Sequence, residues 1–287
     1  MIQYLYLGRV GYDDGLRLQS EIAGLVAEGR LKNVLLLLEH PPVLTLGRNA
    51  NRANVLASDA LLAARGLTLH QINRGGDVTY HGPGQLVGYP IFDLRTLTNP
   101  NGGRMGPVDF VRGMEEALIR VCLGFGVPAG RVPGLTGVWC SAAGTEGQGT
   151  RGSEADSRPS GPDRKIGAIG IHVAKGITSH GFAFNVTTDL RDFDLIIPCG
   201  IPDHAVTSLE SELARPDELP ALETVAHQAA RQFGQIFDQQ VLAVESLDLL
   251  RAQAAEAPQE FPAGDTPMRI PAEVERLRGQ AERPVQA

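Results

Sequence analysis

Residues 165–186 read KIGAIGIHVAKGITSHGFAFNV and contain two strand-like segments joined by a turn. The first ten residues alternate small and β-branched side chains, the pattern of a strand that is buried on one face. Lys175 and Gly176 supply the chemistry of a turn. The residues after them predict the returning strand, so we expect a β-hairpin with Lys165 at its head.

A short loop after this hairpin carries the tripeptide Pro198-Cys199-Gly200. The proline restricts the approach of the chain, and the glycine leaves the thiol uncrowded. A thiol is mostly protonated at neutral pH, and a nearby ammonium group or base raises its thiolate fraction. Two interpretations are open at this point. Cys199 is a nucleophile activated by Lys165, or Cys199 is a buried cysteine and Lys165 a surface lysine.

A second unusual stretch, residues 74–85, reads RGGDVTYHGPGQ and precedes the predicted strand 86–92. Five of its twelve residues are glycine or proline, which indicates a tight loop whose backbone can approach a ligand closely. The spacing fits neither a Walker loop nor GxGxxG, so we do not interpret it as a phosphate-binding loop. The alternatives are a ligand-binding loop and a glycine-rich turn with a hydrogen-bonded histidine.

The remaining pattern predicts a sheet interrupted by helices. Residues 33–40 and 43–47 are predicted strands separated by two prolines, and we expect them to form a hairpin at the edge of the sheet. The other predicted strands are residues 2–9, 67–73, 127–132 and 137–140. The predicted helices are residues 12–28, 59–65, 107–125 and 220–241. Cys122 falls on the apolar stripe of the third helix, so we expect it in the core.

Length and composition indicate a soluble protein with one large core. The chain has 287 residues, of which 43% are hydrophobic and 21% charged. A net charge of −7 argues against a nucleic-acid or anionic-membrane binder. The three cysteines show no paired spacing, which argues against a disulfide framework or a zinc site. The N-terminus lacks a basic segment typical of a signal peptide, so we expect a cytoplasmic location.

We expect residues 1–250 to form a single catalytic domain. Residues 141–163 contain almost no apolar side chain, which predicts a flexible insertion within this domain. Residues 251–287 are rich in proline and charge, which predicts a disordered C-terminal tail.

Taken together, three blocks resemble the lipoyl(octanoyl) transferase family, the octanoyltransferases of lipoate biosynthesis. They are RGGDVTYHGPGQ at residues 74–85 with Tyr89, the hairpin residues 165–170 and 180–186, and Pro198-Cys199-Gly200. The resemblance spans roughly residues 2–241. The insertion is longer than the family usually needs, and the tail has no counterpart; neither departure touches a motif residue.

The resemblance implies an α/β (α+β) fold, a mixed β-sheet flanked by helices like that of biotin and lipoate protein ligases. It also implies an acyltransferase. Cys199 takes the octanoyl group from the phosphopantetheine thioester of octanoyl-acyl carrier protein. A lysine amine on a lipoyl domain of a 2-oxoacid dehydrogenase, or on the glycine cleavage H protein, then accepts it. No ATP, metal, nucleic acid or membrane takes part.

By the same resemblance, Cys199 and Lys165 are catalytic: Lys165 raises the thiolate fraction of Cys199 and shuttles protons. His180 orients the site or has a purely structural role. The residues implied to bind the substrate are Arg74, Gly75, Gly76, Asp77, Val78, Thr79, Tyr80, His81, Tyr89, Ala168, Ile169, Gly170, His180, Gly181, Phe182 and Ala183.

This sequence has three rival interpretations. An ATP-dependent lipoate or biotin protein ligase forms an acyl-adenylate and needs no nucleophilic cysteine, so Cys199 counts against it. A non-catalytic acyl-carrier binding protein would keep the pocket without forming an adduct. A ligase-type repressor would require a helix-turn-helix segment, and none precedes the first strand.

Overall fold

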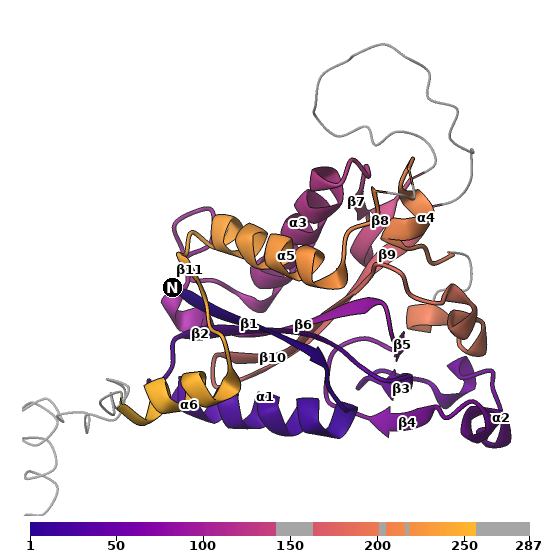
Figure 1. Cartoon of the computed structure of the whole chain (residues 1–287), viewed down its shortest axis with the longest axis horizontal. Coiled ribbons are helices and arrows are strands. Elements are labelled where there is room, and N and C mark those ends of the chain that lie inside the picture. The colour runs from indigo at the N-terminus through magenta and orange to yellow at the C-terminus, as the bar shows by residue number, and fades with distance from the viewer. Residues whose placement is uncertain (142–162, 201–204, 216–217, 257–287) are drawn as a thin grey trace, which may run out of the picture.

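The computed structural model of the chain describes residues 1–141, 163–200, 205–215 and 218–256, apart from the side chain of Cys199. Within these residues, an eight-stranded mixed sheet carries helices on both faces, and a three-stranded sheet lies beside it (Figure 1). The predicted α/β fold with a mixed, helix-flanked sheet is confirmed. None of the described helices combines the length and the apolar character that a membrane crossing requires.

The large sheet places sequence-distant strands side by side. In spatial order its strands are β11 (Val241–Ala243), β1 (Ile2–Arg9), β2 (Asn33–Glu39), β6 (Gln85–Ile91), β10 (Ile177–Asn185), β9 (Arg164–Ala174), β8 (Leu135–Cys140) and β7 (Gly130–Val132). The first three strands are parallel, and the following pairs are antiparallel. In β2, Leu35 and Leu36 lie in different core clusters, so this strand is buried on both faces, as its unbroken apolar run indicates.

Helices close the two faces of this sheet. Helices α3 (Pro107–Gly124) and α5 (Leu222–Ile236) cover one face, and helix α1 (Tyr12–Ala27) covers the other (Figure 1). Cys122 lies on the buried side of α3, which confirms its prediction as a core residue. The remaining short helices are α2 (Asp59–Ala64), α4 (Leu209–Glu212), η1 (Arg52–Asn54), η2 (Leu94–Thr96), η3 (Leu190–Leu195) and η4 (Pro198–Gly200).

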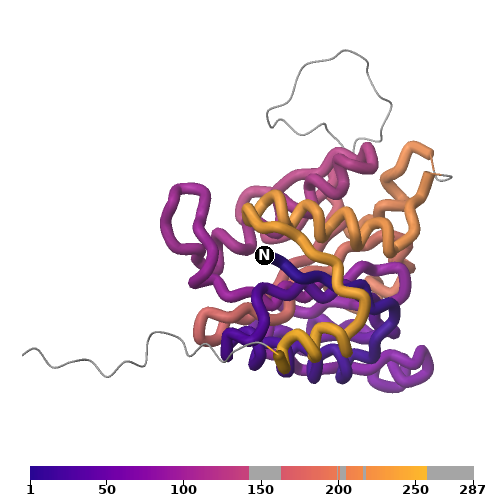
Figure 2. The backbone as a smooth tube through the Cα atoms, turned by 60° about the vertical axis from the view of Figure 1, so that its left-hand side comes forward, coloured from indigo at the N-terminus to yellow at the C-terminus, as the bar shows by residue number. Residues whose placement is uncertain are grey.

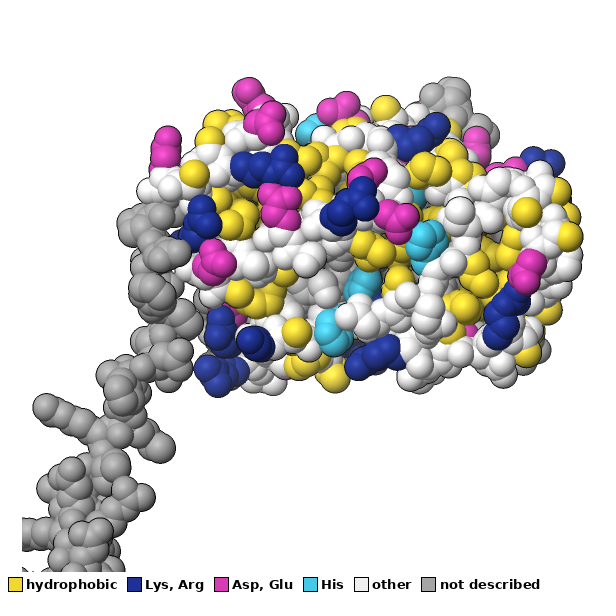
Figure 3. Space-filling view, turned by 90° about the horizontal axis from the view of Figure 1, so that it is seen from below, with side chains coloured by type: hydrophobic (Ala, Val, Ile, Leu, Met, Phe, Trp, Pro, Cys, Tyr) yellow, Lys and Arg dark blue, Asp and Glu magenta, His cyan; other side chains and the backbone are white. Residues whose placement is uncertain are grey.

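Helix α6 (Leu247–Glu256) extends the folded domain beyond the predicted boundary at residue 250. It lies beside α1 (Figure 2), with Leu250 and Ala254 buried and Arg251 paired with Glu21. The prediction of a disordered tail is therefore wrong for residues 251–256, because a four-residue apolar spacing is enough to dock one short helix face. Residues 257–287, like most of the predicted insertion, lie outside the described residues. On the face seen from below in Figure 3, charged side chains of both signs are interspersed with apolar side chains.

The small sheet corrects one prediction about strand pairing. Its order is β4 (Thr68–Gln71), β3 (Val43–Leu46) and β5 (Val78–His81). Strands β2 and β3 therefore do not form a hairpin; β1 and β6 occupy both edges of β2, and β3 pairs with β4 and β5. The two strands are adjacent in sequence, but the chain between them passes from one sheet to the other.

The predicted hairpin is confirmed as β9 and β10, which pair antiparallel along eight positions. Its turn residues, Lys175 and Gly176, have φ angles of 51° and 85°. Positive φ at both central residues is the signature of a type I′ turn, which matches the twist of the flanking strands. This hairpin faces the small sheet.

Candidate active site

A narrow pocket lies between the β9–β10 hairpin and the small sheet. Its cavity volume is about 50 Å³, and the space that opens from it into solvent brings the total to about 490 Å³. Its lining residues are Tyr12, Arg74, Gly76, Asp77, Thr79, His81, Tyr89, Ala168, Ile169, Gly170, His180, Gly181, Phe182 and Ala183. Thirteen of the predicted substrate-binding residues thus meet around one cavity, although they come from both sheets.

Small residues of the hairpin form the floor of this pocket. Across β9 and β10, Ala168 is paired with Ala183 and Gly170 with Gly181. A Cβ atom on Gly170 would come within 2.6 Å of the carbonyl oxygen of Gly75. Real Cβ atoms do not approach backbone this closely, so Gly170 is what lets the glycine-rich loop lie against the hairpin at the pocket.

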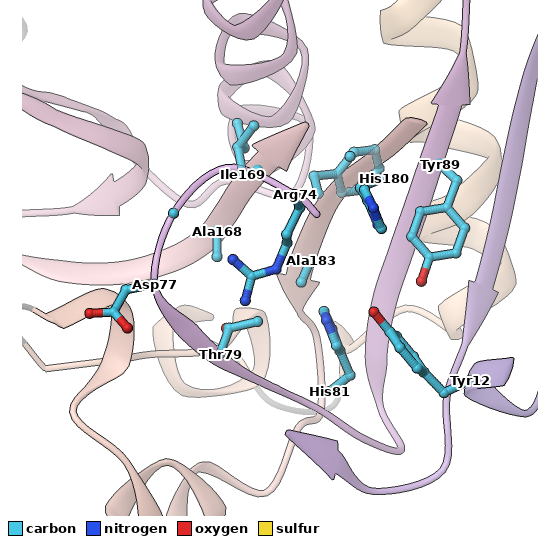
Figure 4. A pocket seen from close by; sticks show the side chains of 14 residues that line it. Tyr12, Arg74, Asp77, Thr79, His81, Tyr89, Ala168, Ile169, His180 and Ala183 are labelled. Carbon is cyan, nitrogen blue, oxygen red and sulfur yellow. The ribbon is translucent and has the colours of Figure 1, made fainter. Parts of the chain in front are cut away.

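Arg74 anchors the glycine-rich loop over the pocket. Its Nη2 donates to both the carbonyl and hydroxyl oxygens of Thr45 at 2.9 Å, and its Nη1 donates to the carbonyl oxygen of Gly75 at 3.0 Å. Figure 4 shows its guanidinium between Asp77 on one side and the histidine-rich end on the other. The loop is therefore held from within by a buried cation.

His81 is held in one tautomer by a fixed amide. Gln85 Nε2 donates to the carbonyl oxygen of Tyr80 and to Asn185 Oδ1, so Gln85 Oε1 must face His81. His81 Nδ1 then donates to Gln85 Oε1 at 2.8 Å, which leaves Nε2 as an acceptor. Burial lowers the pKa of His81 to about 3, so the ring is neutral at pH 7.

His180 adopts a left-handed backbone conformation, with φ 56°. Its backbone N–H donates to Gln19 Oε1 at 2.7 Å, and its Nε2 donates to Asn73 Oδ1 at the same distance. Burial lowers the pKa of His180 to about 4. A non-glycine residue at positive φ is strained, and these contacts hold it in place.

Tyr12 is a pocket residue that sequence reasoning missed. It was predicted only as the first residue of a helix, where nothing in the local pattern distinguishes a pocket residue from a core residue. Its ring stacks at 6.1 Å on His81 and meets His40 edge-on at 5.1 Å. His40 in turn donates from Nδ1 to the carbonyl oxygen of Val10 and accepts from the Tyr89 hydroxyl.

Three predicted substrate-binding residues do not line the pocket. Strand side chains alternate between the two faces, so the neighbours of Thr79 point away from the cavity. Val78 and Tyr80 are instead buried in the core of the small sheet. Gly75 contributes its backbone, with its N–H donating to the carbonyl oxygen of Ile171.

Lys165 is buried at the start of β9, with 7% of its surface exposed. This rules out the alternative that Lys165 is a surface lysine. Its Nζ lies 4.6 Å from the centre of the Trp139 ring, a cation–π contact. Its backbone pairs with the segment that follows the cysteine loop, through hydrogen bonds of 2.9 Å with Ala205 and Thr207.

The cysteine loop lies at the Asp77 end of the pocket. Helix η4 carries Cys199 in its backbone, and a Cβ atom on Gly200 would come within 2.6 Å of Asp77 Oδ2. The N–H of Ile197 donates to the carbonyl oxygen of Asn54 at 2.7 Å. The structure therefore brings the backbone of the predicted nucleophile to one end of the predicted acyl pocket.

The other two cysteines are buried free thiols. Burial raises the pKa of both Cys122 and Cys140, which keeps them protonated and unreactive. Among the described residues, no group of three His, Cys, Asp or Glu side chains could hold a metal ion.

Comparisons with known proteins agree with this geometry. The family model for the lipoyl protein ligase A/B catalytic domain matches residues 12–234. An octanoyltransferase of Acidobacterium capsulatum is 57% identical over 247 residues, covering 86% of this chain and 94% of that protein. An octanoyltransferase of Koribacter versatilis is 48% identical over 264 residues, covering 92% and 93%.

A solved structure shows the same fold at low sequence identity. It is a bi-partite lipoate protein ligase from Thermoplasma acidophilum, with a TM-score of 0.60 and 15% identity, and the match covers 88% of this chain and 90% of that chain. The chain therefore belongs to the lipoyl protein ligase A/B catalytic domain family and, within it, to the octanoyltransferases.

Proposed function

We propose that this acyltransferase moves an octanoyl group from octanoyl-acyl carrier protein to Cys199 and then to a lysine of a lipoyl domain. Three observations support the proposal: Ala168 and Ala183 line the pocket, Lys165 is buried on the same strand as Ala168, and the cysteine loop lies against Asp77. The identity of the acyl group as octanoyl is inferred from relatives that are named octanoyltransferases.

In the first step, the sulfur of Cys199 attacks the thioester carbonyl carbon. A bond forms between this carbon and Sγ, and the bond to the phosphopantetheine sulfur breaks. The proton of the Cys199 thiol passes through Lys165 to the departing thiolate. One thioester replaces another, so the step is close to thermoneutral.

In the second step, the uncharged ε-amine of the lipoyl-domain lysine attacks the acyl-enzyme carbonyl carbon. A carbon–nitrogen bond forms, the carbon–sulfur bond breaks, and the amine proton returns to Cys199 by way of Lys165. An amide is more stable than a thioester, so the transfer proceeds without ATP.

The pocket suits an uncharged chain. Each buried methylene contributes about 0.8 kcal/mol to binding. Because burial lowers the pKa values of His81 and His180, both imidazole rings are neutral at pH 7 beside the proposed octanoyl chain. The proposed reaction takes place in the cytoplasm, where thiols such as Cys122 and Cys140 stay reduced.

The test is transfer to an isolated lipoyl domain, measured as the mass of the octanoylated domain. We expect product from octanoyl-acyl carrier protein in the absence of ATP. Strict dependence on ATP would identify a ligase, and binding of the carrier without any transfer would identify a non-catalytic binding protein. Either result would contradict the proposal.

A further inference from the structure

Lys165 owes its place to an irregularity in β9. Ile166 lies in the core under α3 and α5, and so does Ile169, although residues three apart on a regular strand face opposite sides. The register between β8 and β9 shifts at this point, from Val138 opposite Gly167 to Trp139 opposite Lys165. This bulge puts both Lys165 and Ala168 on the face opposite that core, the face of the pocket.

The bulge brings Trp139 and Lys165 onto the same face. Directly opposed residues of antiparallel strands have side chains on one side of the sheet. Trp139 is 2% exposed, and Lys165 Nζ lies 4.6 Å from the centre of its ring. The Trp139 ring therefore restricts the position of the Lys165 amine, the proposed proton shuttle.

A buried carboxylate holds a backbone N–H of β8 next to this bulge. Glu115 of α3 is fully buried, and its Oε1 accepts the backbone N–H of Gly137 at 3.0 Å. Its Oε2 accepts from Arg112 at 2.7 Å and from Arg131 at 3.0 Å. The arginines balance its charge on one oxygen, and the other oxygen holds the strand.

Gly137 transmits this anchor to Lys165. Its φ angle is 125°, and a Cβ atom there would lie 2.6 Å from the carbonyl oxygen of Gly167 and 3.3 Å from Lys165 Cε. A side chain at position 137 would therefore crowd both β9 and the lysine, and the glycine leaves room for them.

We infer that Glu115 is a positioning residue for Lys165, acting through the Gly137 peptide and the bulge that sets Trp139 opposite the lysine. The inference rests on the proposed role of Lys165 in octanoyl transfer. Placement within about 0.5 Å governs the efficiency of a catalytic group, so the loss of this anchor slows the step that Lys165 serves.

Two variants of Glu115 separate its hydrogen bond to Gly137 from its negative charge. Glu115→Leu removes the acceptor for Gly137, whereas Glu115→Gln keeps a side-chain carbonyl oxygen in its place. Glu116→Gln is the matched control, because Glu116 shares Arg131 but has no hydrogen bond to β8. The readouts are the single-turnover rate of Cys199 octanoylation and the hydrogen exchange of the Gly137 amide.

We expect Glu115→Leu to slow octanoylation on the order of ten- to a hundredfold and to lose protection at Gly137. Glu115→Gln should stay within about threefold of the parent protein in rate, and Glu116→Gln should be unchanged. In the Lys165→Ala background, Glu115→Leu should have no further effect, because its only route to the chemistry is then gone.

An equal slowing by Glu115→Leu in both backgrounds would overturn the inference and leave the proposed function intact. A parental rate in Lys165→Ala alone would overturn both the role of Lys165 and the inference. If Glu115→Leu does not fold, the octanoylation rate is measured instead for Trp139→Phe and Trp139→Leu, each with Lys165 present and in the Lys165→Ala background. The leucine variant should then slow the step only when Lys165 is present, and equal slowing without Lys165 would again overturn the inference.

Discussion

Ala168 lies directly opposite Ala183 across the β9–β10 hairpin, and both side chains line the pocket. In the proposed function, these small side chains border the acyl chain. A larger side chain at either position would occupy the space of several methylenes.

We therefore expect Ala183→Leu to lower the rate of transfer of an octanoyl group about tenfold or more and to affect a butanoyl group much less. The measurement is kcat/KM with the two acyl-carrier substrates. Ala174→Leu is the control, because Ala174 lies on the same hairpin but is exposed. An equal loss for both chain lengths would show that Ala183 does not border the chain.

The approach of Gly200 to Asp77 predicts a second effect. Gly200→Ala places a methyl group 2.6 Å from the carboxylate and should displace the cysteine loop, so that Cys199 octanoylation slows about tenfold or more. Gly134→Ala is the control: Gly134 also has positive φ but open space around it. It should cost about 1 kcal/mol in unfolding free energy without slowing the reaction. Matching octanoylation rates in the two variants would refute this account of the loop.

The strained backbone of His180 makes Gln19 a stability determinant. Gln19→Ala removes the acceptor of a buried N–H, which should lower the free energy of unfolding by about 1–3 kcal/mol in urea titrations. Ser20→Ala, at the exposed neighbouring position, should change it by less than about 0.5 kcal/mol. If Gln19→Ala is as stable as the parent protein, the hydrogen bond to Gln19 is not needed to keep His180 at positive φ.

The buried histidines predict how stability depends on pH. Burial lowers the pKa of His40 and His180 to about 4, below the ordinary value of 6.5. The unfolded chain therefore binds protons below pH 6.5 that the folded chain does not, so stability is full above pH 6.5 and falls from there toward pH 4. Each histidine contributes up to about 1.4 kcal/mol per pH unit.

Urea titrations at pH 7, 6 and 5 measure this dependence. The slope between pH 6 and 5 should become smaller in His40→Gln, which removes one of the groups. A slope that does not change in this variant would show that His40 is not the source.

Local patterns in the sequence were sufficient for the hairpin and for the glycine-rich loop, and the resemblance to the family supplied most of the pocket residues. The type I′ turn at Lys175 and Gly176 follows from turn chemistry, and the glycines of residues 74–85 predicted a tight loop, whose Gly75 lies against Gly170 of the hairpin. The packing of α3 followed from its apolar stripe, including Cys122.

Features that depend on distant partners could not be predicted in this way. Strand β3 pairs with β4 and β5 and not with β2, and this pairing depends on the positions of strands that are distant in the sequence. Tyr12 enters the pocket because α1 packs beside the small sheet, and the bulge that sets Lys165 opposite Trp139 arises from the pairing of β8 with β9. Val78 and Tyr80 were assigned to the pocket with their whole motif, although strand alternation sends them to the core.

The most direct test of the account is the intact mass of the protein after incubation with octanoyl-acyl carrier protein, without ATP and without a lipoyl domain, followed by peptide mapping. We expect one octanoyl adduct on Cys199, no adduct in Cys199→Ala, and a slower appearance of the adduct in Lys165→Ala. No adduct on the parent protein, or an adduct on another residue, would contradict the account.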